Sequence, residues 1–353
     1  MTERPAPAQH VLAQVADGVG IITLNRPEKL NALTEEMVDA IGRTLTTWQD
    51  DDAVQIVALH GAGERGFCAG GDIKVFYESI TQDRHGDFLR FLSREFEVDQ
   101  QIALYPKPVV AFMDGLCMGG GVGLAAHAAV RIATPRSRIG MPEVRIGYSP
   151  DVGGTHLLGR APGRMGEHLA LTAAAMGAAD AIDAGFADFC MQEDGLDQLL
   201  ASLPDLMGLS SPEVASALEV LHGVAPPAAT RTLTPGRTWI DVAYSGETVA
   251  DILVVLDQTP VQAAREAAAE IRKHSPLSLE TALQAVRAAR DDAFLPSAFT
   301  RELRIAEFLM DHPDLPEGIR AQVIDKDRTP RWNPADVREI DREAVAAAIQ
   351  PPG

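Results

Sequence analysis

Glycine-rich turns that follow apolar runs constrain the fold of this chain more than any other feature. The turn "GFCAGGD" comes after the run "VQIVALH", and the turn "MGGGVG" comes after the run "KPVVAFM". Short β-branched runs of this kind are typical of buried strands, and each turn leads into a helical pattern. The order strand, glycine turn, helix predicts an α/β domain with stacked sheets or a mostly parallel sheet.

The remaining patterns divide the chain into two regions. "VLAQVADGVGIITLN" predicts two strands joined at Asp17-Gly18, and helices are expected after Thr34, as N-cap, and from Arg84 to Leu104. Beyond about Ala178 the segments have helical periodicity, so we expect no further strands there. We therefore predict an α/β core over residues 1–190 and a helical C-terminal region over residues 191–353, with a Pro/Gly-rich loop near 222–237.

Charge and cysteine content restrict the partners and the compartment. The 353 residues carry a formal net charge of -19, which repels nucleic acid and anionic membrane, so we expect neither as a partner. The three cysteines have no metal-ligand spacing and favour a reducing compartment, and no metal site is expected. The N-terminus lacks the apolar core of a signal peptide, and no run approaches the ~18 apolar residues of a spanning helix. These features predict a cytoplasmic protein.

The two glycine turns offer backbone N–H groups at helix starts. Two such turns on adjacent strands can aim two donors at one oxygen, as in an oxyanion hole. Either turn alone could instead be an ordinary strand-to-helix connection. A dinucleotide site is a third possibility, because Gly121, Gly123 and Ala126 fit G-x-G-x-x-A and Glu143 lies about 20 residues on. The residues "DGLCM" between strand and turn, and the lack of an acid in "VRIAT", weigh against it.

A third turn, "MPEVRIGYSPDVGGTHLL", carries two acids among apolar residues and glycines. Asp151 precedes a helix start and could be only a helix cap. Glu143 does not fit that role. An acid in apolar surroundings has a raised pKa or a specific partner, and both favour acid–base or nucleophilic chemistry.

Four segments carry a resemblance to a known family: "ITLNRPEKLNAL", "GFCAGGDIK", "GLCMGGGVGLAAH" and "MPEVRIGYSPDVGGTHLL". In this order and spacing they resemble the crotonase (enoyl-CoA hydratase/isomerase) superfamily over about residues 11–190. The resemblance implies a core of repeated ββα units with two roughly perpendicular sheets, and C-terminal helices that cover the acyl-CoA site. It also implies an oxyanion hole from the N–H groups of Gly71 and Gly120, and a possible homo-oligomer, a trimer or hexamer.

One departure from the superfamily pattern bears on the reaction. Enoyl-CoA hydratases have two catalytic glutamates, but here Gly123 stands at the first position and only Glu143 remains. The chain is closer to the branch that hydrolyses 3-hydroxyacyl-CoA thioesters, which implies the substrate 3-hydroxyisobutyryl-CoA of valine breakdown. There Glu143 would attack the thioester carbon or activate water, and Asp151 would orient the acyl hydroxyl or the water. Glu95 aligns with an acid of the acyl pocket, but could equally be a solvated charge on a helix face.

Coenzyme A enters as part of the substrate, so no separate cofactor is expected. The resemblance assigns contacts with coenzyme A to Gly71, Asp72, Ile73 and Lys74, the first turn and the residues after it. Arg26 and Lys29 are the nearest candidates for phosphate contacts, or they are surface charges. Two other functions stay open: hydration or isomerisation of an enoyl-CoA, and a non-catalytic binding protein of the same fold.

Overall fold

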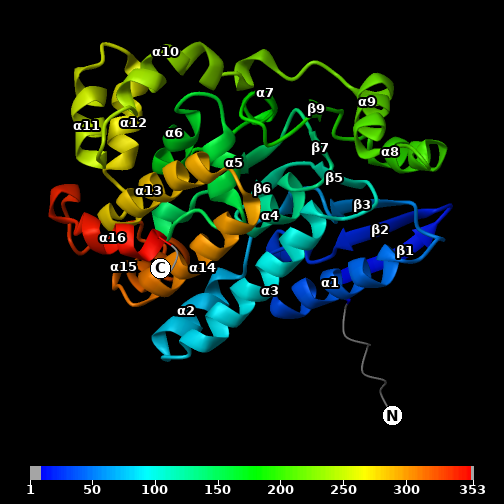
Figure 1. Ribbon diagram of the computed structural model, residues 1–353, viewed down its shortest axis with the longest axis horizontal. Coiled ribbons are helices and arrows are strands. Elements are labelled where there is room, and N and C mark those ends of the chain that lie inside the picture. The colour runs from blue at the N-terminus through cyan, green and yellow to red at the C-terminus, as the bar shows by residue number, and fades with distance from the viewer. Residues whose placement is uncertain (1–8, 351–353) are drawn as a thin grey trace.

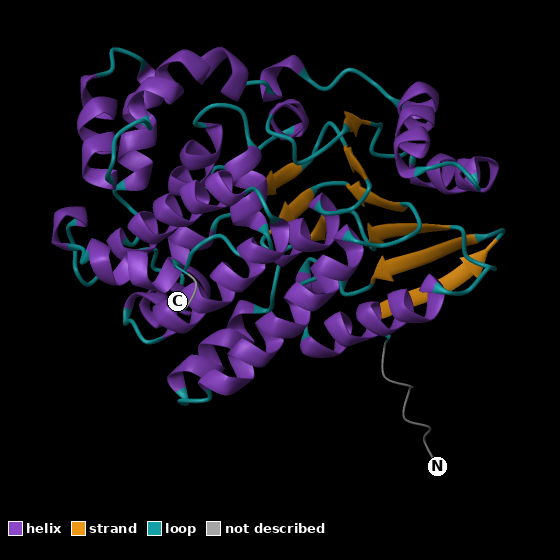
Figure 2. Cartoon of the chain, viewed as in Figure 1, coloured by secondary structure: helices purple, strands orange, loops and turns teal. Residues whose placement is uncertain are grey.

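The larger sheet of the protein is mostly parallel. The computed structural model describes residues 9–350, and its strands are drawn in orange in Figure 2. The six-stranded sheet has the order β1-β2-β3-β5-β7-β9. The strands are β1 Val11–Ala16, β2 Val19–Leu24, β3 Ile56–Gly61, β5 Val109–Met113, β7 Val130–Ala133 and β9 Phe189–Cys190. Only β1 and β2 pair antiparallel, as a hairpin through Asp17 and Gly18, which confirms that prediction.

A second, three-stranded sheet holds the glycine turns. It contains β4 Gly66–Cys68, β6 Leu116–Met118 and β8 Arg138–Gly140, all parallel. The chain alternates between the sheets: β3 is followed by β4, β5 by β6 and β7 by β8, and helices follow each pair. This is the repeated ββα arrangement expected from the resemblance, and both glycine turns leave the small sheet side by side. The perpendicular orientation of the sheets stays a prediction.

The helices of the first half match their sequence patterns closely. They are α1 Glu35–Gln49, α2 Ile73–Thr81, α3 His85–Ala103 and α4 Gly120–Ala126. The hydroxyl group of Thr34 accepts a hydrogen bond from the N–H of Met37 at 3.3 Å, so the predicted N-cap is confirmed. Helix α3 lies within one residue of the predicted limits at each end.

The second half of the chain is helical, as Figure 1 shows, and its helices α14 and α15 lie beside α3 and α2. Its helices are α5 Gly154–Arg160, α6 Met165–Thr172, α7 Ala178–Asp183, α8 Leu196–Ser202, α9 Ser211–His222, α10 Leu233–Ala243, α11 Val249–Gln258, α12 Gln262–Ile271, α13 Pro276–Asp292, α14 Leu295–Met310, α15 Asp314–Ile319 and α16 Arg342–Ile349. Two short helical turns are used below: the 3-10 turn η2 Glu143–Ile146, which precedes α5, and the π turn η5 Arg320–Ile324, which follows α15.

Two sequence predictions for this half are wrong in detail. Strands do not stop at Ala178, because the two-residue strand β9 pairs with β7. The loop predicted near 222–237 is shorter, since α10 already begins at Leu233. Pro235 lies in the first turn of α10, where a proline loses no hydrogen bond because that N–H has no partner within the helix.

The C-terminal helices share the main apolar core with the sheets. One buried cluster contains side chains from β2, α3, α13 and α14, and the rings of Phe96 and Phe299 lie 5.5 Å apart within it. Packing of this kind fixes α14 against the core, and with it any polar side chain that α14 directs inward. None of the helices between residues 9 and 350 is long and apolar enough to cross a membrane.

Candidate active site

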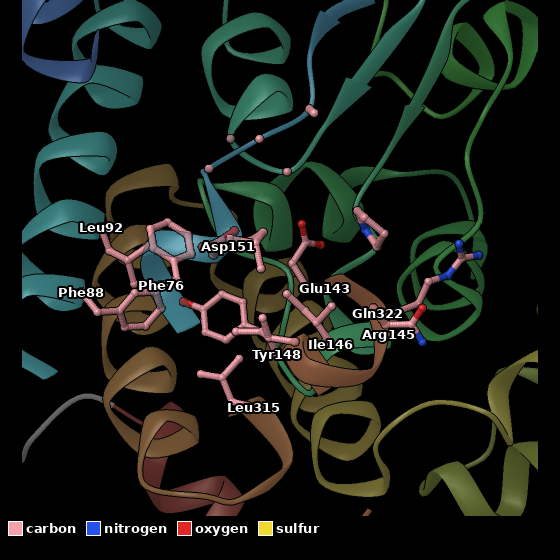
Figure 3. A pocket seen from close by; sticks show the side chains of 18 of the residues that line it. Phe76, Phe88, Leu92, Glu143, Arg145, Ile146, Tyr148, Asp151, Leu315 and Gln322 are labelled. Atoms are coloured by element: carbon pink, nitrogen blue, oxygen red, sulfur yellow. The ribbon is translucent and has the colours of Figure 1, made fainter. Parts of the chain in front are cut away.

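A cavity of about 200 Å³ brings together most of the residues singled out from the sequence (Figure 3). Gly71, Glu95, Gly120, Glu143 and Asp151 all line it. They come from the turn after β4, from α3, from the start of α4, and from η2 and the loop that follows it. Residues of α2, α15 and η5 complete the wall.

The two glycine turns lie against each other at this cavity. Gly70 (φ +91°) and Gly119 (φ +50°) have backbone angles that favour glycine, and a Cβ on Gly70 would stand 3.3 Å from the nitrogen of Gly120. Within residues 9–350, neither the Gly71 N–H nor the Gly120 N–H donates a hydrogen bond. The cavity wall therefore offers two backbone N–H donors that are available to bind a ligand.

Two carboxyl groups of α3 lie against glycines of α4. A Cβ on Gly120 would overlap Oε1 of Glu95, and a Cβ on Gly123 would lie 2.5 Å from Oδ2 of Asp99. Glu95 and Asp99 are four residues apart, hence on one face of their helix. Both are buried, so the alternative of a solvated charge for Glu95 is wrong.

Asp99 was missed by the sequence reasoning. Its signal was the glycine at position 123, where the family resemblance places a glutamate, together with the spacing of one helical turn between Glu95 and Asp99. Neither carboxylate oxygen of Asp99 has a hydrogen-bond partner within the described residues. The carboxyl group of Asp99 thus takes the space that a side chain at position 123 would need.

Glu143 begins η2 and directs its carboxylate at the second glycine turn. A Cβ on Gly119 would lie 3.1 Å from its Oε1, while its Oε2 is buried without a hydrogen-bond partner. Burial raises the pKa of Glu143 to about 8, with smaller contributions from the charges of Glu302 and Glu95. Its place in a 3-10 turn, rather than at a strand end, also contradicts the dinucleotide alternative.

Asp151 is buried at the same cavity, and it is not the cap of α5. That role belongs to Glu302 on α14, whose carboxylate accepts hydrogen bonds from the N–H of Gly153 at 2.7 Å and of Thr155 at 3.0 Å. The cap alternative for Asp151 is therefore wrong. Glu302 lies 149 residues beyond Gly153, and no local pattern indicates the contact.

These acids, Glu95, Asp99, Glu143, Asp151 and Glu302, form one buried group that we call the acid cluster. None of them makes an ion pair with a Lys, Arg or His among residues 9–350. Burial raises the pKa of Glu95 to about 8 and of Glu302 to about 7, and it raises those of Asp99 and Asp151 as well. Some members therefore hold protons at neutral pH, which makes the cluster both a donor and an acceptor of protons.

The acid cluster does not resemble a metal centre. In the described part of the chain, no group of three or more His, Cys, Asp or Glu side chains is placed to hold a metal ion. His127, at the C-terminal end of α4, contacts the carbonyl of Val152 through Nε2 at 2.8 Å, and burial lowers its pKa to about 4. It therefore stays neutral and supports the turn after Asp151.

The residues predicted to contact coenzyme A are only partly at the cavity. Ile73 lines it, but Asp72, Lys74, Arg26 and Lys29 do not. Arg26 instead donates to the carbonyl of Ala32 at 2.6 Å and pairs with Asp72 at 3.4 Å, so its guanidinium holds the first turn in place. Lys29 and Lys74 are exposed, and their contacts with coenzyme A stay predictions.

Comparison with known proteins identifies the family. A family model described as enoyl-CoA hydratase/isomerase matches residues 19–349. This chain belongs to that family. The recognition from the four sequence segments is confirmed, and so are the mixed α/β fold and its C-terminal helices.

Curated relatives within the family are named as thioester hydrolases. The 3-hydroxyisobutyryl-CoA hydrolase, mitochondrial, of Gallus gallus is 35% identical over 98% of this chain and 90% of its own length. The protein of the same name from Rattus norvegicus is 37% identical over 94% of this chain and 86% of its own length. Because these relatives are named mitochondrial, the cytoplasmic location expected from the sequence stays a prediction.

Solved structures with the same fold have other names. A carnitinyl-CoA dehydratase from Mycobacterium thermoresistibile has a TM-score of 0.90 and 42% identity, covering 97% of both chains. An enoyl-CoA hydratase from Rhodobacter sphaeroides 2.4.1 has a TM-score of 0.89 and 40% identity, covering 97% of this chain and 98% of that one. The family is therefore an enzyme family of acyl-CoA chemistry, while the names of its members divide between hydrolysis and hydration.

Proposed function

We propose that the protein hydrolyses an acyl-CoA thioester, with 3-hydroxyisobutyryl-CoA as substrate and 3-hydroxyisobutyrate and CoA as products. The observation that carries the proposal is that Glu143 lies at the same cavity as two N–H groups without partners, those of Gly71 and Gly120, while Asp99 fills the space at Gly123, where the family resemblance places a catalytic glutamate of the hydratases. The names of curated relatives over nearly the whole chain support the same reaction. This would make the protein an enzyme of valine breakdown.

The first step in this mechanism is polarisation of the thioester. Its carbonyl oxygen accepts hydrogen bonds from the N–H groups of Gly71 and Gly120, and each such donor is typically worth ~2.7–4 kcal/mol of barrier. Both donors belong to turns that follow the paired strands β4 and β6, so we expect little rearrangement of the N–H groups when charge develops on the oxygen. They would stabilise the tetrahedral oxyanion more than the ground-state carbonyl.

Glu143 then supplies the second step in one of two ways. Its ionised carboxylate attacks the carbonyl carbon, CoA leaves as the thiolate, and water hydrolyses the resulting mixed anhydride. Alternatively it accepts a proton from water as that water attacks the carbon. Both ways need Glu143 ionised, so a pKa near 8 means that the rate rises with pH through that value.

The other acids would hold the acyl group. Asp151 and Glu95 line the same cavity, and in their protonated or ionised forms they can donate to or accept from an acyl hydroxyl group. Coenzyme A belongs to the substrate in this scheme, and no further cofactor takes part. A cytoplasmic location and a homo-oligomer, trimeric or hexameric, complete the proposal.

Hydration of an enoyl-CoA, or the reverse dehydration, is the second candidate. The names of the two solved structures at 40–42% identity favour it. Addition of water across a double bond uses two positioned acids, one for each proton transfer. In this chain the carboxyl group nearest position 123 belongs to Asp99, which does not line the cavity.

An assay of CoA release separates the candidates. The protein is mixed with 3-hydroxyisobutyryl-CoA, isobutyryl-CoA and acetyl-CoA, and free thiol is measured with a thiol reagent. We expect faster release of CoA from 3-hydroxyisobutyryl-CoA than from the other two thioesters. In a parallel assay with crotonyl-CoA, we expect no loss of its absorbance. Hydration of crotonyl-CoA without CoA release would overturn the proposal in favour of the second candidate.

A further inference from the structure

Tyr148 brings a polar group to an otherwise apolar end of the cavity. It follows Gly147, whose left-handed conformation (φ +77°) ends η2, and its side chain lines the cavity while the residue is only 5% exposed. The phenol ring packs edge-to-face against Phe88, with centroids 6.1 Å apart. Figure 3 shows the hydroxyl group directed toward Phe76 and Phe88.

The hydroxyl group of Tyr148 is buried without a hydrogen-bond partner in the described chain. Buried hydroxyl groups are almost always paired, because an unpaired one has lost its water and gained nothing. The apolar side chains around it, Phe76, Phe88, Leu92 and Leu315, offer no acceptor, and the acceptor close to it is the carboxyl group of Asp151. Tyr148 lowers the pKa of Asp151 slightly against the larger effect of burial, so the two are close, yet no hydrogen bond of good geometry joins them.

The missing partner has a definite chemistry. Gly71, Gly120, Phe76, Phe88 and Tyr148 line the same cavity, so in the proposed binding mode the acyl group of a thioester held by the two glycines would extend among the three aromatic side chains. A hydroxyl group on that acyl chain can accept from the phenol and donate to the carboxylate of Asp151 at once. An apolar acyl group of the same size leaves the phenol unpaired, and an acyl carboxylate is repelled by the acid cluster.

We propose that Tyr148 is a specificity-determining residue that selects hydroxylated acyl groups over apolar ones of equal size. This inference rests on the proposed function and deepens it. The phenol is well suited to the task, because burial keeps its pKa raised and the proton in place at neutral pH. The ring is held by Phe88, so little freedom is lost when the substrate binds.

The test is Tyr148→Phe, which removes one oxygen and keeps the ring. The values of kcat/KM for 3-hydroxyisobutyryl-CoA and isobutyryl-CoA are compared in the wild type and the variant. We expect the preference for the hydroxylated thioester to fall about tenfold, the effect of one lost neutral hydrogen bond, with isobutyryl-CoA turnover unchanged or higher. Tyr105→Phe is the matched control, since the Tyr105 hydroxyl donates to the carbonyl of Leu45 outside the cavity and its loss should not change the preference.

Two outcomes of this comparison would count against the inference. An equal fall for both thioesters would give Tyr148 a packing role only, and an unchanged ratio would remove it from recognition altogether. If the wild type releases CoA from neither thioester, the proposed function fails separately. In that case, calorimetric titration measures the dissociation constants of the same two thioesters for Glu143→Gln with and without Tyr148→Phe. The inference holds if Tyr148→Phe lowers the preference for the hydroxylated thioester, and it fails if the ratio of the two constants stays the same.

Discussion

Two regions of this molecule bury carboxyl groups, and they do so in opposite ways. Glu167 on α6 is fully buried, and Arg290 and Arg164 donate hydrogen bonds to it at 2.6–2.7 Å. Burial alone would raise its pKa, but these donors outweigh burial and the pKa is lowered. The acid cluster, at similar depth, has no such cation among residues 9–350, and its pKa values are raised.

This contrast separates an acid that stabilises the fold from acids that can take part in a reaction. A paired carboxylate such as Glu167 ties α6 to α13 and has no remaining capacity for a ligand. An unpaired buried acid destabilises the fold, and such a group persists where it serves a reaction. Three members of the acid cluster, Glu95, Glu143 and Asp151, accordingly line a cavity, whereas Glu167 faces arginines.

Glu143→Gln tests the role of the acid cluster in the reaction and should have the largest effect on turnover. We expect kcat to fall at least about 10³-fold, since the variant lacks the attacking or proton-accepting oxygen, with the melting temperature unchanged or raised. Steady-state CoA release and thermal unfolding measure the two. The matched control is Glu97→Gln on the exposed face of α3, which should keep wild-type turnover. A fully active Glu143→Gln would remove this residue from the mechanism.

Glu167→Gln tests the role of the paired acid in stability, and we expect it to lower stability without lowering turnover. The change leaves the partly buried Arg290 and Arg164 without their carboxylate, so the free energy of unfolding should fall by about 3 kcal/mol. Turnover per folded molecule should stay near the wild type. Denaturant unfolding gives the first quantity and active-site titration the second. A loss of turnover with intact stability would contradict the division between the two regions.

Gly123→Ala tests whether Asp99 fills the space at position 123. A Cβ there meets Oδ2 of Asp99 at 2.5 Å and Cβ of Val152 at 2.7 Å, and overpacking of this kind costs about 1–3 kcal/mol of stability. Adding Asp99→Ala should recover part of that loss, because only the contact with Val152 then remains. Unfolding free energies of the two single variants and the double variant measure the coupling. Strict additivity would show that Asp99 does not occupy this space.

Asp99→Asn should have the smallest effect, and one that depends on pH. The folded-state pKa of Asp99 is raised, so the wild type loses stability as pH rises from the unfolded value near 3.9 toward the folded value. The neutral variant escapes this loss and should be more stable than the wild type by about 1 kcal/mol at pH 8, with little gain at pH 4. Melting temperatures across this range check the prediction, and a gain independent of pH would contradict it.

The sequence was informative wherever a function depends on the backbone or on one short segment. The glycine turns at Gly71 and Gly120 follow predicted strands, and Glu143 and Asp151 lie on one bent segment, so their approach to one cavity could be expected. The α/β class was predictable for the same reason, since the longer strands, turns and helices have local patterns, whereas the ββα repeats were expected only from the family resemblance.

What the sequence missed depends on contacts between distant segments. Glu302 caps α5 across a separation of 147–149 residues, and the apolar pattern of α14 gives no sign of it. Tyr148 lies on the same segment as Glu143 and Asp151, and Asp99 follows Glu95 by one helical turn, but only the contacts of α3 with α4 and of the Tyr148 ring with Phe88 reveal their unpaired polar atoms. The short strand β9 forms because β7 offers an edge, against the absence of a strand pattern.

A crystal structure of the Glu143→Gln variant with 3-hydroxyisobutyryl-CoA tests the central claim most directly. The account predicts the thioester oxygen about 2.7–3.1 Å from the nitrogens of both Gly71 and Gly120, with the residue 143 side chain beside the carbonyl carbon. A thioester bound with its oxygen away from either nitrogen, or with its carbon out of reach of residue 143, would contradict it.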